Sequence, residues 1–427
     1  ALLFVWARAL FGLRGAAIAT SLFLLCPTIL AHGHLATLDM ACALGVLASA
    51  FAVRRAVQVP SWTRWLVAGA VWGAALLVKF TALLLLPAFA GLALYARWRA
   101  WRRGLAELAT LLAAALLVVN LGMGFQGSGA RLDGFRFGSD LAQGLQAALP
   151  GWLPVPLPGD YVRGYDAVMR DTEHGEFPSY LRGTWSREGW WYYEAVALLV
   201  KTPEPFVLML LASPFFLARQ RLERRELVSL LAPLAAVALA MTLLNRLNIG
   251  LRYLLPVFPF LYLLLGSLFA KPGRVSAAIA ALVLAYYAGT ALVVHPAHLA
   301  YFNPLSGGPA RGHRWLLDSN LDWGQDLYRL PAALEARGIH EPIQLLYFGH
   351  VDPRLYGLAT MPLPPGPVDG VVAVSVSYLA GFSYPATTAD GSLAVVAPDH
   401  VRWLRDRAPV ARLGSIWLYD LRAPAGP

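Results

Sequence analysis

The chain has 427 residues, of which 58% are hydrophobic and 14% charged, and its formal net charge is +10. A soluble domain carries roughly 25% charged residues, so this composition excludes an ordinary soluble fold and indicates a polytopic membrane protein. The positive charge does not indicate nucleic-acid binding, because the arginines lie in short loops between apolar segments. The two cysteines, Cys26 and Cys42, have no metal-binding spacing, and we expect two unrelated buried thiols.

Apolar segments follow one another from the first residue, and several are shorter than the ~20 residues of a full membrane span. Because the chain begins with Ala1 inside such a segment, we expect a fragment that has lost its N-terminal end. The predicted spans are 1–11, Gly15–Ala31, Met40–Val53, Trp65–Val78, Thr81–Tyr95, Leu105–Phe125, Phe206–Leu217, Leu227–Leu244, Leu254–Ala270 and Val275–Val294.

The charges in the connecting loops predict the orientation of the spans. Alternate loops are rich in positive residues, and by the positive-inside rule these loops are cytoplasmic. The opposite set is poor in positive charge, and it includes 32–39, the loop at Lys79 and the turn between Arg246 and Arg252. The positive set consists of Arg8 and Arg14; Arg54, Arg55 and Arg64; Arg97, Arg99, Arg102 and Arg103; Arg219, Arg221, Arg224 and Arg225; Lys271 and Arg274.

We therefore predict a polytopic α-helical membrane protein with a C-terminal extracytoplasmic α/β domain. Its parts are transmembrane helices in 1–125 with an outer loop at 32–39, an extracytoplasmic loop 126–203, transmembrane helices in 204–294 and the α/β domain in 295–427. In the long loop we expect interfacial helices near Leu141–Ala148 and Tyr161–Arg170. In the α/β domain the patterns predict helices at Asp326–Arg337 and His400–Arg405 and strands at Ile343–Phe348, Val371–Ser377 and Ser415–Tyr419.

A first group of candidate functional residues lies in the short outer loop, which contains His32, His34 and Asp39. An acid at the end of a helix can hold a divalent metal ion or a phosphate, or act as a base. Thr37 or Asp39 can equally cap the next helix, which is worth about 1 kcal/mol. A divalent metal ion is the candidate cofactor, and both interpretations stay open.

Four cations form a second group, since Lys79, Lys201, Arg246 and Arg252 all fall at the predicted outer ends of helices. Cations at this depth are costly unless they meet a partner, which makes them functional candidates. Anchoring of the helix ends at the membrane surface is the alternative. Gathered beside an acid, lysine and arginine would suit an anionic lipid headgroup such as a polyprenyl phosphate.

A polar segment, residues 301–326, separates the apolar part of the chain from the predicted α/β domain. Three of its aspartates recur every four residues, but the segment lacks the glycine and terminal glutamate of a calcium-binding EF-hand. Metal binding and docking of the α/β domain onto the membrane part both remain open. Its notable polar residues are Asn303, Asp318, Asn320, Asp322 and Asp326.

These segments resemble a known family. The strings LAHGHLATLDM, LLVKFTALLLLP, WWYYEAVALLVKTPEPF, LNIGLRYLLPVFPF and DSNLDWGQDL are similar to bacterial members of the protein O-mannosyltransferase-like membrane enzymes, glycosyltransferase family 39 of the GT-C superfamily. The resemblance implies a multi-pass protein of the bacterial inner membrane. It also implies inverting transfer of a sugar, a mannose-type hexose, from a polyprenyl-phosphate donor to an acceptor hydroxyl on the extracytoplasmic side.

The resemblance also suggests roles for individual residues. It implies that Asp39 is the acid of an outer loop near the donor phosphate or a metal, that Lys79 contacts this phosphate, and that Arg252 is a further contact. It assigns no role to Lys201 or to the C-terminal aspartates. The family's catalytic acid lies in an outer loop that would precede Arg8, so we expect this chain to bind donor but to turn over poorly.

Two other classes of function remain in view. A transporter or flippase of lipid-linked saccharides would explain the cations without a base, although no internal repeat is visible in the sequence. A non-catalytic scaffold would not require Asp39. As partners we expect the polyprenyl-phosphate-linked sugar, membrane lipid and an acceptor protein or glycolipid, with no nucleic acid.

Overall fold

A computed structural model describes residues 1–175, 177–243, 245–387 and 392–422. Among these residues, six helical segments are long and apolar enough to cross a membrane, or seven if the bent pair α9 (Tyr193–Lys201) and α10 (Glu204–Ala218) forms one span. This arrangement confirms the predicted polytopic α-helical architecture. The six segments are α1 (Leu2–Leu25), α3 (Asp39–Gln58), Trp98–Gly122 with α6 (Trp101–Gly122), α11 (Arg224–Leu243), Leu251–Phe269 and α13 (Arg274–Val294).

The two first predicted spans form one helical element with a break. Helix α1 is interrupted at Gly12, whose φ of 72° lies in the left-handed region that glycine adopts without steric cost. Helix α2 (Pro27–His34) follows directly, with Pro27 in its first turn, where the missing N–H has no helical partner to lose. It carries the chain to the short loop before α3.

Small residues bring the helices of the bundle close together. A Cβ added at Gly69 of α4 (Trp62–Val78) would lie 2.3 Å from the carbonyl oxygen of Leu111 in α6. One turn later, a Cβ at Gly73 would lie 2.7 Å from the carbonyl oxygen of Ala115. Close backbone approach through glycine is typical of helix pairs in membranes. The 3-10 helix η1 (Phe80–Leu85) and α5 (Leu86–Ala96) return the chain across the bundle beside α6.

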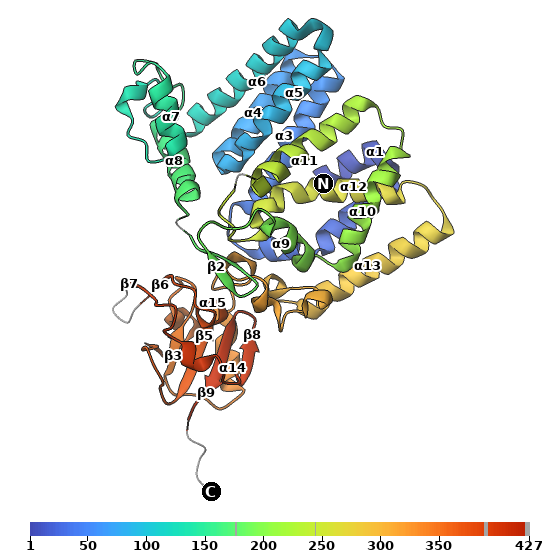
Figure 1. Ribbon diagram of the computed structural model, residues 1–427. Coiled ribbons are helices and arrows are strands. Elements are labelled where there is room, and N and C mark those ends of the chain that lie inside the picture. The colour runs from blue at the N-terminus through green and yellow to red at the C-terminus, as the bar shows by residue number, and fades with distance from the viewer. Residues whose placement is uncertain (176, 244, 388–391, 423–427) are drawn as a thin grey trace.

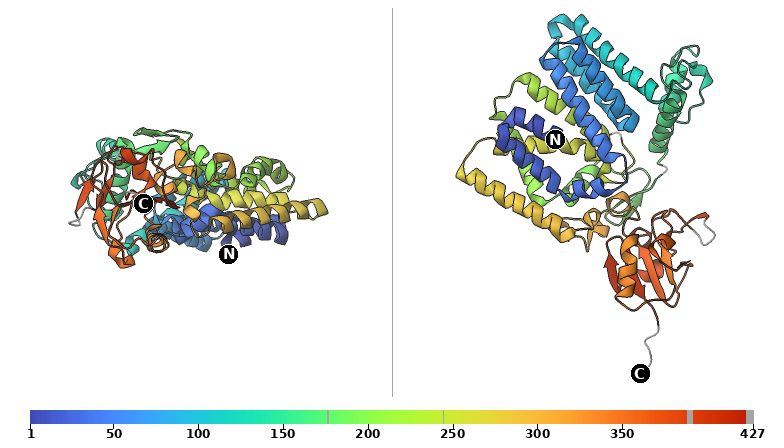
Figure 2. Two further views of the ribbon diagram at one scale, coloured as in Figure 1. Left: turned by 90° about the horizontal axis from the view of Figure 1, so that it is seen from below. Right: turned by 180° about the vertical axis from the view of Figure 1, so that it is seen from behind.

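Two helices of the long loop stand apart from the bundle. Figure 1 shows α7 (Asp140–Ala148) and α8 (Gly159–His174) projecting beside the end of α6, and Figure 2 shows the same arrangement from behind. Both helices lie where the sequence predicts them. The strands β1 (Ser179–Leu181) and β2 (Thr184–Ser186), which form an antiparallel hairpin, lead from α8 back to α9.

The C-terminal part is an α/β domain, as predicted, at one end of the bundle (Figure 1). Its five-stranded sheet has the order β4-β3-β5-β9-β8, in which β3 pairs in parallel with β4 and β5 while β9 is antiparallel to β5 and β8. Separate hydrophobic clusters pack on its two faces. The strands are β3 (Ile343–Leu346), β4 (Thr360–Pro362), β5 (Val371–Ser375), β8 (Ala411–Leu413) and β9 (Ile416–Asp420).

Other elements of this domain are shorter than the sequence patterns predict. The helix expected at Asp326–Arg337 is a 3-10 turn followed by α14 (Leu330–Glu335), and only Arg402–Leu404 of the second predicted helix is helical. Strand β5 ends at Ser375, because the chain turns there into α15 (Val376–Leu379). The hairpin of β6 (Pro385–Thr387) and β7 (Leu393–Val395) was not predicted.

Candidate functional site

An ion pair between two neighbouring helices forms the centre of the candidate site. Asp39 is the first residue of α3, and Lys79 directly follows the last residue of α4. The Lys79 Nζ atom lies 2.5 Å from Asp39 Oδ1. The aspartate side chain is 2% exposed and the lysine side chain 25%. The pair therefore presents its cationic half toward the surface.

A second cation lies close to this pair. Arg252 is in η4 (Leu251–Val257), and its guanidinium carbon is 5.3 Å from the ring centre of Tyr253 and 4.7 Å from that of Trp323. The Lys79 Nζ atom is 5.1 Å from the same Tyr253 ring. Cations at such distances are attracted to aromatic faces. Tyr253 thus contacts both cations, and the buried Arg252 Nε has no hydrogen-bond partner within the described structure.

The polar segment holds η4 in place. The Oδ1 atom of Asn320 accepts a hydrogen bond of 3.0 Å from the backbone N–H of Leu251, and its Nδ2 donates one of 2.8 Å to the hydroxyl of Tyr193. The hydroxyl of Ser319 donates to the carbonyl of Ile249. These contacts hold the backbone at Ile249 and Leu251, directly before Arg252. They support the docking interpretation of the polar segment for Asn320.

The three regularly spaced aspartates have separate environments. Asp318 adopts a φ of 55°, and burial raises its pKa to about 6 although the Arg252 guanidinium acts to lower it. Asp322 accepts a hydrogen bond of 2.9 Å from the N–H of Gly324, and burial raises its pKa to about 7. Asp326 accepts a hydrogen bond of 2.9 Å from the N–H of Ser415 and lies 3.3 Å from Arg329. None of the three belongs to a described cluster of metal-ligating groups.

Lys201 and Asn303 lie within a structural junction rather than at an open surface. Lys201 is 3% exposed, and its Nζ donates hydrogen bonds of 2.7 Å to the carbonyls of Leu299 and Asn320. The ring centre of Phe302 is 4.2 Å away on another side. Asn303 accepts from the N–H of Ser306 and donates to backbone carbonyls at the end of α9. The surroundings of Lys201 therefore differ from those expected of a phosphate ligand.

Arg246 is separated from this group in its contacts. It is exposed, and no side-chain hydrogen bond or ion pair of Arg246 occurs within the described residues. The structure therefore brings Lys79 and Arg252 together with Asp39 and leaves Arg246 and Lys201 out of the group. Sequence reasoning missed Tyr253 and Trp323, although each follows a charged residue directly, in the strings RY and DW.

The two histidines of the outer loop are arranged differently. His32 is 4% exposed with no hydrogen-bond partner found for Nδ1 in the described chain, and burial lowers its pKa to about 4. His34 is exposed, with its Nδ1 2.5 Å from the carbonyl oxygen of Leu30 and its ring stacked on His298 at 5.6 Å. His32, His34 and Asp39 do not form one of the clusters of metal-ligating atoms found among the described residues.

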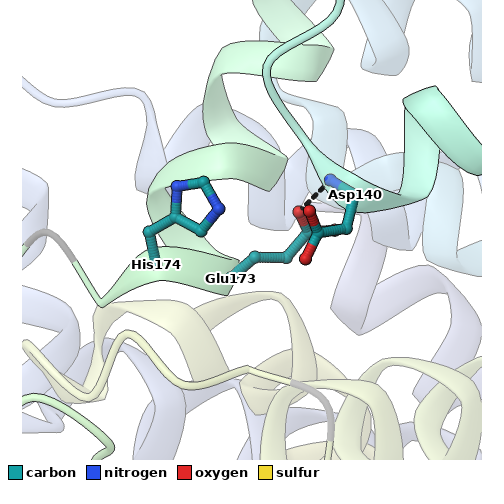
Figure 3. Close-up of side chains that lie close together, drawn as sticks. All are labelled: Asp140, Glu173 and His174. Atoms are coloured by element: carbon teal, nitrogen blue, oxygen red, sulfur yellow. Dashed lines mark hydrogen bonds between the residues drawn. The ribbon is translucent and has the colours of Figure 1, made fainter.

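A different trio of metal-ligating side chains is found in the long loop. The ligand atoms of Asp140, Glu173 and His174 lie within 4.8 Å of one another (Figure 3). Glu173 accepts hydrogen bonds of 2.6 Å and 3.2 Å from the N–H groups of Asp140 and Leu141. The carboxylate of Glu173, a residue of α8, therefore lies at the first turn of α7, where it stabilises that helix without any metal.

The architecture and the site together define a polytopic helical membrane protein with a cationic group at one end of its bundle. Residues 1–122 match a family model described as dolichyl-phosphate-mannose-protein mannosyltransferase. Over this segment the match confirms the expected resemblance to the GT-C membrane glycosyltransferases. It includes Asp39 and Lys79 but ends before Arg252.

A solved structure, described as the crystal structure of ArnT from Cupriavidus metallidurans bound to undecaprenyl phosphate, is similar with a TM-score of 0.47 and 16% sequence identity. The similarity covers 99% of this chain and 82% of that one. No curated protein matches the chain.

Proposed function

We propose that this protein is a membrane glycosyltransferase that takes a sugar from a polyprenyl-phosphate donor. The observation that carries the proposal is the pairing of Lys79 and Arg252 around Tyr253 at one end of the bundle. The description of the family model, which names a polyprenyl-type phosphate as the sugar carrier, supports it for residues 1–122. The same description names mannose, so we propose a mannose-type hexose as the sugar.

In this proposal the two cations bind the donor phosphate. The acceptor oxygen forms a bond to the anomeric carbon while the bond from that carbon to the phosphate oxygen breaks, which inverts the configuration. The electron pair leaves with the phosphate, and the acceptor hydroxyl gives up its proton to a base. Lys79 and Arg252 neutralise the charge that grows on the phosphate, and such fixed charges are often the largest contribution to catalysis.

Asp39 has two roles in this mechanism. Its Oδ1 orients the Lys79 ammonium group. Its Oδ2 is buried and accepts no hydrogen bond from the described residues, and we assign it to a hydroxyl group of the bound sugar. The proposal gives these residues roles without a metal ion, since His34 contacts other groups and Lys79 compensates the charge of Asp39.

Binding of a short-chain polyprenyl-phosphate mannose to the full chain in detergent tests this assignment. We expect Lys79→Ala and Arg252→Ala each to weaken binding at least tenfold, since a hydrogen bond to a charged group is worth about 1.5–3 kcal/mol. The matched control is Arg246→Ala. It removes an exposed arginine six residues before Arg252 and should leave binding unchanged. Binding that survives both site substitutions would contradict the proposal and favour the transporter alternative.

We further propose that the site faces the extracytoplasmic side of the bacterial inner membrane, where a protein or glycolipid supplies the acceptor hydroxyl. The clustering of arginines at the opposite ends of the helices supports this orientation. A cysteine introduced at the exposed Arg402 should react with a membrane-impermeant maleimide on intact spheroplasts, since Cys26 and Cys42 are buried. Labelling only after lysis would show that the α/β domain is cytoplasmic and would contradict the proposed orientation.

A further inference from the structure

A cavity lies between the end of α13 and the α/β domain. Its volume is about 570 Å³, which falls in the range of small-molecule sites. Neither Lys79, Asp39 nor Arg252 lines it. The lining residues that matter here are Tyr286, Gly289, Thr290, Val293, His295 and Arg329.

One wall of this α13 pocket continues into the surface that faces the membrane. Helix α13 lies at the edge of the bundle (Figure 1). Only 28% of its most apolar 18-residue stretch is buried in the described structure. Val293, which lines the pocket, is 85% exposed, and its neighbour Leu292 is 76% exposed. On a helix apolar enough to span the bilayer, such residues meet lipid chains. We therefore expect an alkyl chain of a lipid to lie against this wall of the pocket.

On the other wall of the pocket, Arg329 supplies a positive charge near the C-terminal end of α13. Arg329 belongs to the α/β domain, and a single guanidinium nitrogen, Nη1, pairs with Asp326 at 3.3 Å in the described structure. His295 directly follows the last residue of α13 and is exposed. The hydroxyl groups of Tyr286 and Thr290 are already used within the protein, by Glu204 and by the carbonyl of Tyr287. Arg329 is thus the group left to bind an anion.

From this arrangement we infer a second lipid site: the α13 pocket binds one membrane phospholipid, with an acyl chain along Thr290 and Val293 and an anionic headgroup phosphate at Arg329. Arginine suits phosphate because its planar group donates two parallel hydrogen bonds. A basic residue close to the membrane surface attracts anionic lipid headgroups electrostatically. The inference stands apart from the proposed transferase function, because it uses none of the residues assigned to the sugar donor.

Lipid retention by the purified full chain tests the inference, with phosphatidylglycerol and phosphatidylcholine as the two probes and native mass spectrometry as the readout. Gly289→Trp fills the pocket, because a Cβ at this glycine meets no atom within 4 Å. We expect it to abolish retention of phosphatidylglycerol. The matched control is Val275→Trp, which places the same ring on an exposed position at the other end of α13 and should leave retention unchanged.

The headgroup contact is tested separately. Arg329→Gln should weaken phosphatidylglycerol binding roughly fivefold and phosphatidylcholine binding much less, as expected for one arginine beside an anionic headgroup. Arg402→Gln, an exposed arginine of the same domain, is the control. Undiminished retention in Gly289→Trp, or equal affinity of the unmodified chain for both lipids, would overturn the inference. So would loss of polyprenyl-phosphate mannose binding in Gly289→Trp, because the pocket would then belong to the donor.

Discussion

Asn320 and Leu251 join the polar segment to the membrane bundle through one hydrogen bond of 3.0 Å, from the Leu251 N–H to the Asn320 Oδ1 atom. Arg252 is the next residue in the chain. The ring centre of Trp323, from the same polar segment, lies 4.7 Å from the Arg252 guanidinium carbon. The loop that leads into the α/β domain therefore fixes both the backbone and the side chain of a proposed phosphate ligand.

Asn320→Ala should weaken donor binding as well as the fold. It leaves the N–H of Leu251 and the hydroxyl of Tyr193 without their partners, and an unsatisfied buried group costs about 1–3 kcal/mol. We expect a lower unfolding temperature in detergent and weaker binding of polyprenyl-phosphate mannose. Trp323→Leu, which keeps these hydrogen bonds, should weaken donor binding with a smaller loss of stability. Unchanged donor binding in both variants would argue against a positioning role for the polar segment.

The Asp39–Lys79 pair predicts unequal effects of its two partners. Asp39 is the more deeply buried, so Lys79→Gln leaves a carboxylate without compensation, whereas Asp39→Asn leaves an ammonium group that reaches the surface. Breaking a buried pair costs up to about 3–5 kcal/mol. We expect Lys79→Gln to lower the unfolding temperature more than Asp39→Asn, and the double variant to lose less than the sum. Strictly additive losses would show that the pair does not interact.

Gly250 predicts a steric effect at the same junction. A Cβ at this position would lie 2.1 Å from the hydroxyl oxygen of Ser319, and this contact is too short for any side chain. Gly250→Ala should therefore displace the polar segment from η4, destabilise the protein and weaken donor binding. Adding Ser319→Ala removes the clashing atom and should restore part of both losses. A Gly250→Ala variant with the unfolding temperature of the parent would contradict this packing.

Adjacent arginines at the opposite end of the bundle should differ sharply. Arg54 is 5% exposed in its side chain and binds Glu226 through Nε and Nη2 at 2.6 Å and 2.7 Å. Its neighbour Arg55 is exposed. Arg54→Gln should cost a few kcal/mol because it removes the cation paired with Glu226 and leaves only the neutral Gln58 amide beside this carboxylate, whereas Arg55→Gln should change the free energy of unfolding by less than about 1 kcal/mol. Equal losses of free energy of unfolding in Arg54→Gln and Arg55→Gln would contradict a stabilising role of the pair between Arg54 and Glu226.

Asp322 predicts a pH dependence of stability. Burial raises its pKa to about 7 in the folded protein, against an unfolded value near 4. The folded state therefore holds the proton more tightly, and this contribution to stability is complete below about pH 4 and is lost as the pH rises through about 7. Asp322→Asn keeps an acceptor for the Gly324 N–H. It should unfold at a higher temperature than the parent at pH 8, with a clearly smaller difference at pH 5 and none at about pH 3. A constant difference across this range would contradict the shifted pKa.

The sequence alone determined the kind of protein and much of its layout. Apolar segments of near-span length require a membrane, and alternation of arginine-rich loops indicated which helix ends lie together. The helices at Leu141–Ala148 and Tyr161–Arg170 and the strands at Ile343–Phe348 and Val371–Ser377 were also visible, because their periodicity is local. The same reasoning selected Asp39, Lys79 and Arg252, but together with Lys201 and Arg246, since cations and acids near a membrane need partners.

Tertiary structure decided which of these candidates share a surface and which serve the junction between the two parts of the chain. The burial of Lys201 against the carbonyls of Leu299 and Asn320 depends on residues about a hundred positions away in the chain. The pairing of Arg54 with Glu226 likewise joins distant helices. A sequence pattern records the charge of a residue and its neighbours along the chain. Only the packing of helices and loops determines whether that charge meets a carbonyl, a carboxylate or an open surface.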